Sequence, residues 1–276
     1  MNYSKTQLKE LGRQMLFTAF EVNENLGALG EKEVASTKDV VLEADIAISK
    51  AVKDVVSKTG IPVILWTEES GRTEIGREPD ITVAFDDLDG TYNKKHGQGI
   101  LPYCSIVTIL EGLFPTYRDA LYAGIIIHNT NDLFEAVRGE GVSKNGEKLQ
   151  SKFSPQLSRD SAIYVNHHET SRAVPNSFRA IGNLESRTIS RDVLSSGVTF
   201  VLVAQHGSAY IGGRNKAHEL GAGYLFMKEV GGTILDFQGR DIGPDNYDFN
   251  ESKSMIAAVT PSIAQEILSE LRKFSG

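Results

Sequence analysis

The chain has 276 residues and a formal net charge of -7, with 24% charged and 40% hydrophobic residues, the composition of an ordinary folded protein. It has no basic stripe for binding nucleic acid and no apolar run of about 18 residues for crossing a membrane. Since the first residues also lack an apolar signal segment, we expect a cytoplasmic protein without nucleic-acid or membrane partners. The single cysteine, Cys104, cannot form an internal disulfide and is expected in the core.

Two helices are predicted near the N-terminus. The first has apolar residues at spacings of three and four, the pattern of a helix that buries one face: Leu8, Leu11, Met15, Ala19 and Val22. Residues 27–38 then read as an exposed loop, because glycine, charged and small residues replace the apolar pattern. A second helix is expected over residues 46–57, with Asp45 as its N-cap.

A series of short strands bounded by turns follows the helices. The expected strands cover residues 61–66, 81–85, 104–110, 121–127 and 133–137. Asn145 and Gly146 form a hairpin signal, since both residue types tolerate positive φ. These residues by themselves predict an antiparallel sheet with helices on one side.

Strands and helices alternate in the second part of the chain. Strands are predicted at residues 162–166, 233–237 and 255–259, with further apolar runs at 198–204 and 220–230. A terminal helix is expected to start at Thr260, with Pro261 in its first turn. We place a soft boundary near residue 155, which divides one compact unit into residues 1–155, a metal-binding half with the antiparallel sheet, and residues 156–276, an α/β half that completes the active site.

Acidic residues directly follow two of the predicted strands. The segment Asp86-Asp87-Leu88-Asp89 places three carboxylates within four residues after the strand at 81–85. Like charges this close repel unless solvent or a cation separates them, and a hard cation such as Mg²⁺ suits oxygen ligands. An isolated segment of this kind is more often a solvated acidic turn. However, Glu68 also follows a strand, and Gly90-Thr91 leaves backbone N–H groups that can hold a phosphate. A combined metal and phosphate site is therefore the stronger hypothesis.

Other ligand-binding motifs fail on spacing. An EF-hand loop with Gly90 at its sixth position would run from Phe85 to His96, and neither residue is the required carboxylate. The glycines at 139, 141 and 146 do not fit a dinucleotide fingerprint or a P-loop, so they are expected in turns.

Several segments resemble, in order along nearly the whole chain, motifs of the inositol monophosphatase and fructose-1,6-bisphosphatase superfamily. They are residues 41–45 (VLEAD), 66–70 (WTEES, family GEES), 86–91 (DDLDGT, family DPxDGT), 136–146 (AVRGEG with a following NG) and 217–232 (AHELGAG with a following EVGG, family WDxAAG with EAGG). One such motif is weak evidence, but the ordered set is specific. The resemblance implies a layered αβαβα sandwich of the sugar-phosphatase type.

The resemblance also implies roles for individual residues. Two or three Mg²⁺ ions, with Mn²⁺ as a substitute, would be held by Glu68, Asp86, the Leu88 carbonyl, Asp89 and Glu219. Asp45 and Thr91 match a pair that orients and deprotonates the attacking water, and Glu68 takes part in the same catalytic group. Thr91 and the Gly90 amide would contact the substrate phosphate. Cations in such a site lower the pKa of the water and neutralise the reacting oxygens.

The implied activity is hydrolysis of a small sugar or cyclitol phosphate. The chain looks most similar to archaeal-type members that act on both inositol monophosphate and fructose 1,6-bisphosphate, and members are commonly homodimers. Arg191, Arg214 and Lys216 fall where such enzymes bind substrate, although each is equally well explained as solvated surface charge.

Some residues depart from the family pattern. Asp87 replaces proline, Thr67 replaces glycine, and His218-Glu219 replace the Trp-Asp pair. These changes bear on the affinity of the second metal. Two alternatives therefore stay open: a 3'(2'),5'-bisphosphate nucleotidase or NADP phosphatase of the same fold, and a homologue that binds metal and phosphate with weakened turnover.

Overall fold

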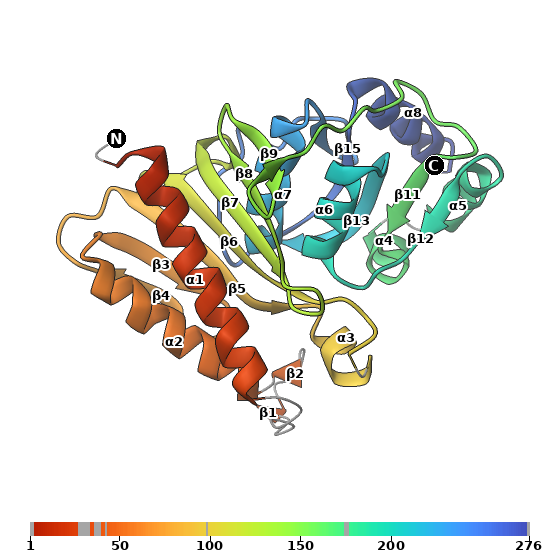
Figure 1. Cartoon of the computed structure of the whole chain (residues 1–276). Coiled ribbons are helices and arrows are strands. Elements are labelled where there is room, and N and C mark those ends of the chain that lie inside the picture. The colour runs from red at the N-terminus through yellow and green to blue at the C-terminus, as the bar shows by residue number, and fades with distance from the viewer. Residues whose placement is uncertain are drawn as a thin grey trace.

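The fold consists of two sheets and three layers of helices (Figure 1). It is seen in a computed structural model that describes residues 3–26, 34–35, 40–41, 43–97, 99–173 and 177–274. Most of the loop predicted at 27–38 lies outside these residues. The layered α/β arrangement expected for the fold class is confirmed.

The larger sheet has eight strands in the order β10-β9-β8-β7-β6-β5-β3-β4. Neighbouring strands are antiparallel except β3 and β5, which run parallel. The strands are β3 (Val63–Thr67), β4 (Gly71–Ile75), β5 (Ile81–Asp89), β6 (Cys104–Glu111), β7 (Ala120–Ile127), β8 (Asp132–Val137), β9 (Gly141–Lys144) and β10 (Glu147–Lys148). The short strands β1 (Val34–Ala35) and β2 (Val40–Val41) pair separately.

The second sheet has five strands in the order β12-β11-β13-β15-β14. Here β11 runs parallel to both β12 and β13, so their carboxyl ends lie at the same edge. The strands are β11 (Ala162–Val165), β12 (Ile189–Arg191), β13 (Ala209–Lys216), β14 (Thr233–Asp236) and β15 (Ser252–Ala258). The change of sheet falls between β10 and β11, while the proposed division at residue 155 stays a prediction.

The helices cover both faces of the larger sheet. The helices are α1 (Lys5–Leu26), α2 (Glu43–Thr59), α3 (Thr91–His96), the 3₁₀ turn η1 (Tyr117–Asp119), α4 (His167–Ala173), α5 (Ser177–Glu185), α6 (Ser196–Gln205), α7 (Ala217–Glu229) and α8 (Pro261–Arg272). One core joins α1 and α2 to this sheet, as Figure 1 shows. A second core joins its other face to α6, α7 and the second sheet. The helices of the first part, α1 and α2, thus lie on one side of this sheet as predicted, and α7 from the second part covers the opposite face.

Helix α7 approaches its neighbours closely because small residues line it. A Cβ atom at Gly223 would collide with the Phe200 ring of α6, and one at Gly221 would press on Thr108 of β6. Helices α6 and α7 are buried on most sides, which explains their nearly continuous apolar sequences. This close packing brings the first turn of α7 to the larger sheet.

Several local predictions are confirmed. Thr260 caps α8 by accepting from the Ile263 N–H, with Pro261 in the first turn. Asn145 and Gly146, both at positive φ, join β9 to β10. The predicted N-cap role of Asp45 was wrong, because α2 begins at Glu43 and Asp45 lies inside its first turn. Among the described residues, no helix combines the length and apolarity that a membrane span needs.

Candidate active site

The parallel pairing of β3 and β5 places two acidic strand ends side by side. Thr67 pairs with Phe85 in this register, so Glu68 and Asp86 follow at neighbouring positions. The carboxyl ends of parallel strands share one edge of a sheet, and polar groups that leave them meet there. The two acidic segments predicted to face one another therefore do so.

An irregularity in β5 turns Asp89 toward the same site. Asp86 pairs with Ile106 of β6 and Asp89 with Cys104, so β5 has one residue more than its partner over this stretch. In a regular strand, side chains three residues apart face opposite sides, and an extra residue reverses this relation. The acidic segment is thus the bulged end of a strand that reaches Asp89, and the predicted turn directly after Phe85 was wrong.

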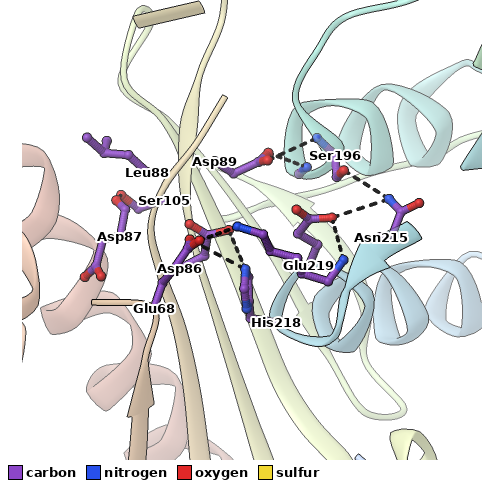
Figure 2. Close-up of polar contacts among 12 residues, drawn as sticks. Glu68, Asp86, Asp87, Leu88, Asp89, Ser105, Ser196, Asn215, His218 and Glu219 are labelled. Atoms are coloured by element: carbon purple, nitrogen blue, oxygen red, sulfur yellow. Dashed lines mark hydrogen bonds and ion pairs between the residues drawn. The ribbon is translucent and has the colours of Figure 1, made fainter. Parts of the chain in front are cut away.

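Glu219 reaches the site from the first turn of α7. Its Oε2 accepts from the Lys216 N–H at 3.2 Å and from Asn215 Nδ2 at 3.4 Å. A carboxylate in the first turn of a helix is favoured because it satisfies free N–H groups there. These bonds aim the side chain across to β5 (Figure 2).

The predicted carboxylate ligands converge into two overlapping groups. One oxygen each of Asp86, Asp89 and Glu219 lies within 4.8 Å of the others. Glu68 and Asp86 form a second such group with His218, through one oxygen of each carboxylate and one ring nitrogen. Asp86 belongs to both groups, and Figure 2 shows the side chains pointing toward one another.

The carboxyl groups differ in how readily they ionise. Burial raises the pKa of Asp86 well above its ordinary value, and the charges of Glu68 and Asp89 add to this. Burial and the neighbouring Asp89 raise the pKa of Glu219 to about 8. Burial opposes ionisation of Glu68 as well, but His218 and Lys216 outweigh it, so the pKa of Glu68 is lowered. While no cation is bound, Asp86 and Glu219 are therefore harder to ionise than Glu68.

Lys216 supplies positive charge inside the site. Its Nζ donates to Glu68 Oε1, and the charges of Glu68 and Glu219 raise the lysine pKa despite the opposing effect of burial. The sequence suggested substrate binding for Lys216, and the structure places its ammonium group against a predicted metal ligand. Burial lowers the pKa of the nearby His218 ring, against the opposing charge of Glu68.

The amino end of α6 anchors Asp89. Its Oδ2 accepts from Ser195 Oγ at 2.6 Å and from the Gly197 N–H at 2.7 Å, and its Oδ1 accepts from the Ser196 N–H at 3.3 Å. Ser195 is also the N-cap of α6, since its hydroxyl accepts from the Val198 N–H. A helix amino end favours a carboxylate, and these three bonds fix Asp89 to the second half of the chain.

The predicted phosphate contacts lie just beyond β5. Gly90 has φ 90° and precedes α3, a conformation that a residue with a side chain rarely adopts. The Thr91 hydroxyl donates to the Leu88 carbonyl at 3.0 Å, which ties the predicted water-positioning group to a predicted metal ligand. The Leu88 side chain is buried in the core that contains residues of α1 and α2, so Leu88 can offer the site only its backbone groups.

Asp45 and Asp87 extend the acidic region toward α2. Asp45 is buried, and its charge acts on both Asp86 and Asp87. Burial, followed by the charge of Asp86, raises the pKa of Asp87 well above its usual range, against the opposing effect of a backbone hydrogen bond from Glu69. In Figure 2 the Asp87 side chain points away from Asp86 and Glu219. The residue that replaces the family proline thus adds a buried acid outside both ligand groups.

Thr67, another departure from the family pattern, supports the turn that carries Glu68. Its hydroxyl bonds Ser49 of α2 at 2.7 Å and accepts from the Ser70 N–H at 3.1 Å. Ser49 also bonds the Ser70 hydroxyl at 2.8 Å. The turn is therefore fixed to α2 through three side-chain hydroxyls, a role that glycine at position 67 would not provide.

A pocket of about 670 Å³ opens beside the carboxylates. It lies at the carboxyl ends of β11 and β12, where ligands of parallel sheets usually bind. Its lining includes Asp89, Glu219 and Tyr210, with Glu169 and Asp192 further out. Arg191 precedes Asp192 and is exposed, while Arg214 lies 3.6 Å from Glu169 in an ion pair, so a substrate role for either arginine stays a prediction.

Sequence reasoning missed the residues that hold the ligands in place. Ser195 before the apolar run of α6 is a recognisable N-cap signal, but its bond to Asp89 joins residues 106 positions apart. Asn215, which bonds Ser196, Tyr210 and Glu219, carries no signal of its own. Tertiary contacts alone make these residues part of the site.

The donor set fits a divalent cation. Carboxylate oxygens from separate elements converge, and Asp86 Oδ1 is buried without a hydrogen-bond partner. Buried like charges are costly unless a counter-ion binds, and hard cations such as Mg²⁺ prefer oxygen donors. A layered α/β fold with such a group beside a pocket defines the class of metal-dependent phosphatases.

Comparison with known proteins identifies the family. The model of the inositol monophosphatase family matches residues 4–275. The Nus factor SuhB of Pasteurella multocida is 30% identical over 239 residues, covering 86% of this chain and 84% of the relative. The fructose-1,6-bisphosphatase/inositol-1-monophosphatase of Thermococcus kodakarensis is 24% identical over 265 residues, covering 93% and 95%. An IMPase/NADP phosphatase crystallised with Mg²⁺ and phosphate shares the fold, with a TM-score of 0.78, 19% identity and coverage of 97% and 96%. The chain belongs to the inositol monophosphatase family, whose phosphatases are phosphoric monoester hydrolases.

The link between α6 and Asp89 predicts the effect of Ser195→Ala. The variant loses the helix cap and the bond to Asp89, so the free energy of unfolding should fall by about 1–2 kcal/mol. Mg²⁺ affinity should fall about tenfold, because Asp89 loses the donor that orients it. Urea unfolding and calorimetry measure the two effects. Ser57→Ala, which alters an exposed helical serine, is the control, and equal results for both variants would contradict the anchoring role.

The raised pKa of Glu219 predicts how pH affects the metal-free protein. Folding raises this pKa from 4.5 to about 8, so the folded state binds the proton more tightly and stability falls as pH rises across this interval. In Glu219→Gln the side chain keeps its shape but cannot titrate, so the stability of this variant should fall less steeply as pH rises. Thermal unfolding in a chelator from pH 5 to pH 8 measures the stability of both proteins. An equal dependence on pH in the wild type and the variant would rule out a contribution from Glu219. Saturating Mg²⁺ should stabilise the wild type more at pH 8 than at pH 5.

Proposed function

We propose that this protein is a Mg²⁺-dependent phosphomonoesterase acting on a small sugar or cyclitol phosphate. The observation that carries the proposal is the convergence of Glu68, Asp86, Asp89 and Glu219 beside the pocket at β11 and β12. Family membership supports the reaction type, and relatives whose names include fructose-1,6-bisphosphatase and inositol-1-monophosphatase support the substrate class.

The proposed chemistry needs no covalent intermediate. Glu68, Asp86, Asp89, Glu219 and the Leu88 carbonyl would hold the cations, which make a bound water acidic and offset charge on the phosphoryl oxygens. Asp45 is the proposed base, because it is a buried carboxylate near Asp86 that lies outside both ligand groups. Thr91 and the Gly90 N–H would orient the phosphate and the water, as the family resemblance implies.

The walls of the pocket favour a substrate with hydroxyl groups. Asp192 and Glu169 line its outer part, where their oxygens can accept hydrogen bonds from a polyol. Arg214 pairs with Glu169, but a second phosphate placed beside Asp192 would meet like charge. We therefore propose a monophosphorylated cyclitol or sugar as the preferred substrate, with fructose 1,6-bisphosphate hydrolysed less efficiently. NADP and 3'-phosphoadenosine nucleotides are the alternative substrates within this fold.

Phosphate release from a panel of substrates tests the proposed function. With Mg²⁺, inositol 1-phosphate should be hydrolysed, and Asp45→Asn should lower kcat at least about 100-fold while leaving Mg²⁺ affinity nearly unchanged. Asp86→Asn should instead lose Mg²⁺ binding. The two variants therefore distinguish the proposed base from a proposed metal ligand. No Mg²⁺-stimulated turnover on inositol 1-phosphate, fructose 1,6-bisphosphate or the nucleotides would overturn the enzymatic proposal. Retained binding of Mg²⁺ and phosphate would then favour a binding homologue, an alternative that the similarity to a Nus factor makes relevant.

The charge on Asp192 gives a prediction for substrate preference. Asp192→Asn removes one negative charge, so the ratio of kcat/KM for fructose 1,6-bisphosphate to that for inositol 1-phosphate should rise about threefold. Asp160→Asn is the matched control, because Asp160 precedes β11 at the end opposite the pocket. Steady-state kinetics with both substrates measures the ratio. An unchanged ratio in Asp192→Asn would show that this wall does not select against the second phosphate.

A further inference from the structure

His218 is a buried histidine whose ring nitrogens have no hydrogen-bond partner. It lies in the first turn of α7, where the family motif has tryptophan, and 3% of its side chain is exposed. Leaving buried polar atoms unpaired costs free energy, so such groups usually serve a ligand or another function. The imidazole is thus available to bind a ligand that the protein itself does not supply.

The ring points at two predicted metal ligands. Nε2 lies 3.3 Å from Asp86 Oδ2 and 3.7 Å from Glu68 Oε2, without forming a hydrogen bond to either. Two ligand atoms that each lie about 2.1 Å from one ion are about 3.0 Å apart when the angle at the ion is a right angle. They are about 3.4 Å apart when that angle is tetrahedral. The observed separations are close to these values, so the three side chains are spaced as ligands of one ion.

Neighbouring residues hold this arrangement in place. The imidazole packs on the Phe249 ring at 4.9 Å between centroids, and Phe249 stacks on Trp66 at 5.2 Å. These ring contacts hold the imidazole in place. Lys216 binds Glu68 Oε1, which leaves Oε2 facing His218 (Figure 2).

We propose that His218, Glu68 and Asp86 form a mixed nitrogen and oxygen site for a divalent transition-metal ion such as Mn²⁺ or Co²⁺. Imidazole nitrogen suits these ions, whereas Mg²⁺ prefers oxygen donors throughout. The neighbouring group of Asp86, Asp89 and Glu219 offers oxygen only and suits Mg²⁺. Asp86 joins the two groups, so the protein holds two unlike metal positions. The inference rests on the proposed active site and adds the identity of one of its ions.

Pulsed electron paramagnetic resonance on the wild-type protein tests the nitrogen ligand directly. Protein freed of metal by a chelator receives excess Mg²⁺, to fill the oxygen-only group, and then one equivalent of Mn²⁺. The Mn²⁺ signal should show modulation from a directly bound imidazole nitrogen. A spectrum with oxygen and water ligands only would overturn the proposal, and this result does not depend on the folding of any variant.

Calorimetric titrations of variants test the selectivity. His218→Gln should raise the Kd for Mn²⁺ at least about tenfold and change the Kd for Mg²⁺ less than about threefold, and the nitrogen modulation should disappear. Lys216→Met removes a cation near both groups, so it should tighten the binding of both ions to a similar extent. His206→Gln is the matched control, because His206 is an exposed histidine at the end of α6. Equal weakening of both ions by His218→Gln, or no weakening, would overturn the proposal.

None of these measurements uses phosphate turnover. A protein that binds Mn²⁺ through nitrogen but hydrolyses no phosphate ester would contradict the proposed function alone. An active protein whose Mn²⁺ has only oxygen ligands would contradict the assignment of His218 alone.

Discussion

Mutual repulsion among convergent carboxyl groups is the constraint on which the site depends. Glu68, Asp86, Asp89 and Glu219 are gathered from two adjacent strand ends and a helix, and burial disfavours ionisation of Asp86 and Glu219. The protein meets part of this cost itself, through Lys216 on Glu68 and through the amino end of α6 on Asp89. The remaining cost falls on Asp86 and Glu219, whose pKa values burial and like charge raise, and a bound cation would offset it. The negative charge that the protein's own groups leave unbalanced thus gives the site its affinity for a metal ion.

The layered fold supplies rigid supports for these charges. The pairing of β3 with β5 sets the separation of Glu68 and Asp86, and the bulge against β6 sets the direction of Asp89. Glycines in α7 allow that helix to pack closely enough for Glu219 and His218 to reach the same point. Because packed interiors deform little, these supports hold the ligands in position before a metal binds.

Three residues that differ from the family motifs lie at this site, and the structure gives each a distinct physical setting. Thr67 fastens the Glu68 turn to α2, Asp87 adds a buried acid on the far side of β5, and His218 presents an unpaired imidazole to two carboxylates.

The sequence by itself determined the local features and the family. Apolar periodicity indicated α1 and most strands, Thr260-Pro261 marked the start of α8, and Asn145-Gly146 marked a hairpin, because each depends on neighbouring residues alone. Ordered motifs also indicated which carboxylates belong together. Only the tertiary structure decided the rest: the extension of β5 through Asp89 and the bond from Ser195 to Asp89. These features arise from register and packing between segments far apart in the chain, and such contacts leave no local pattern in the sequence.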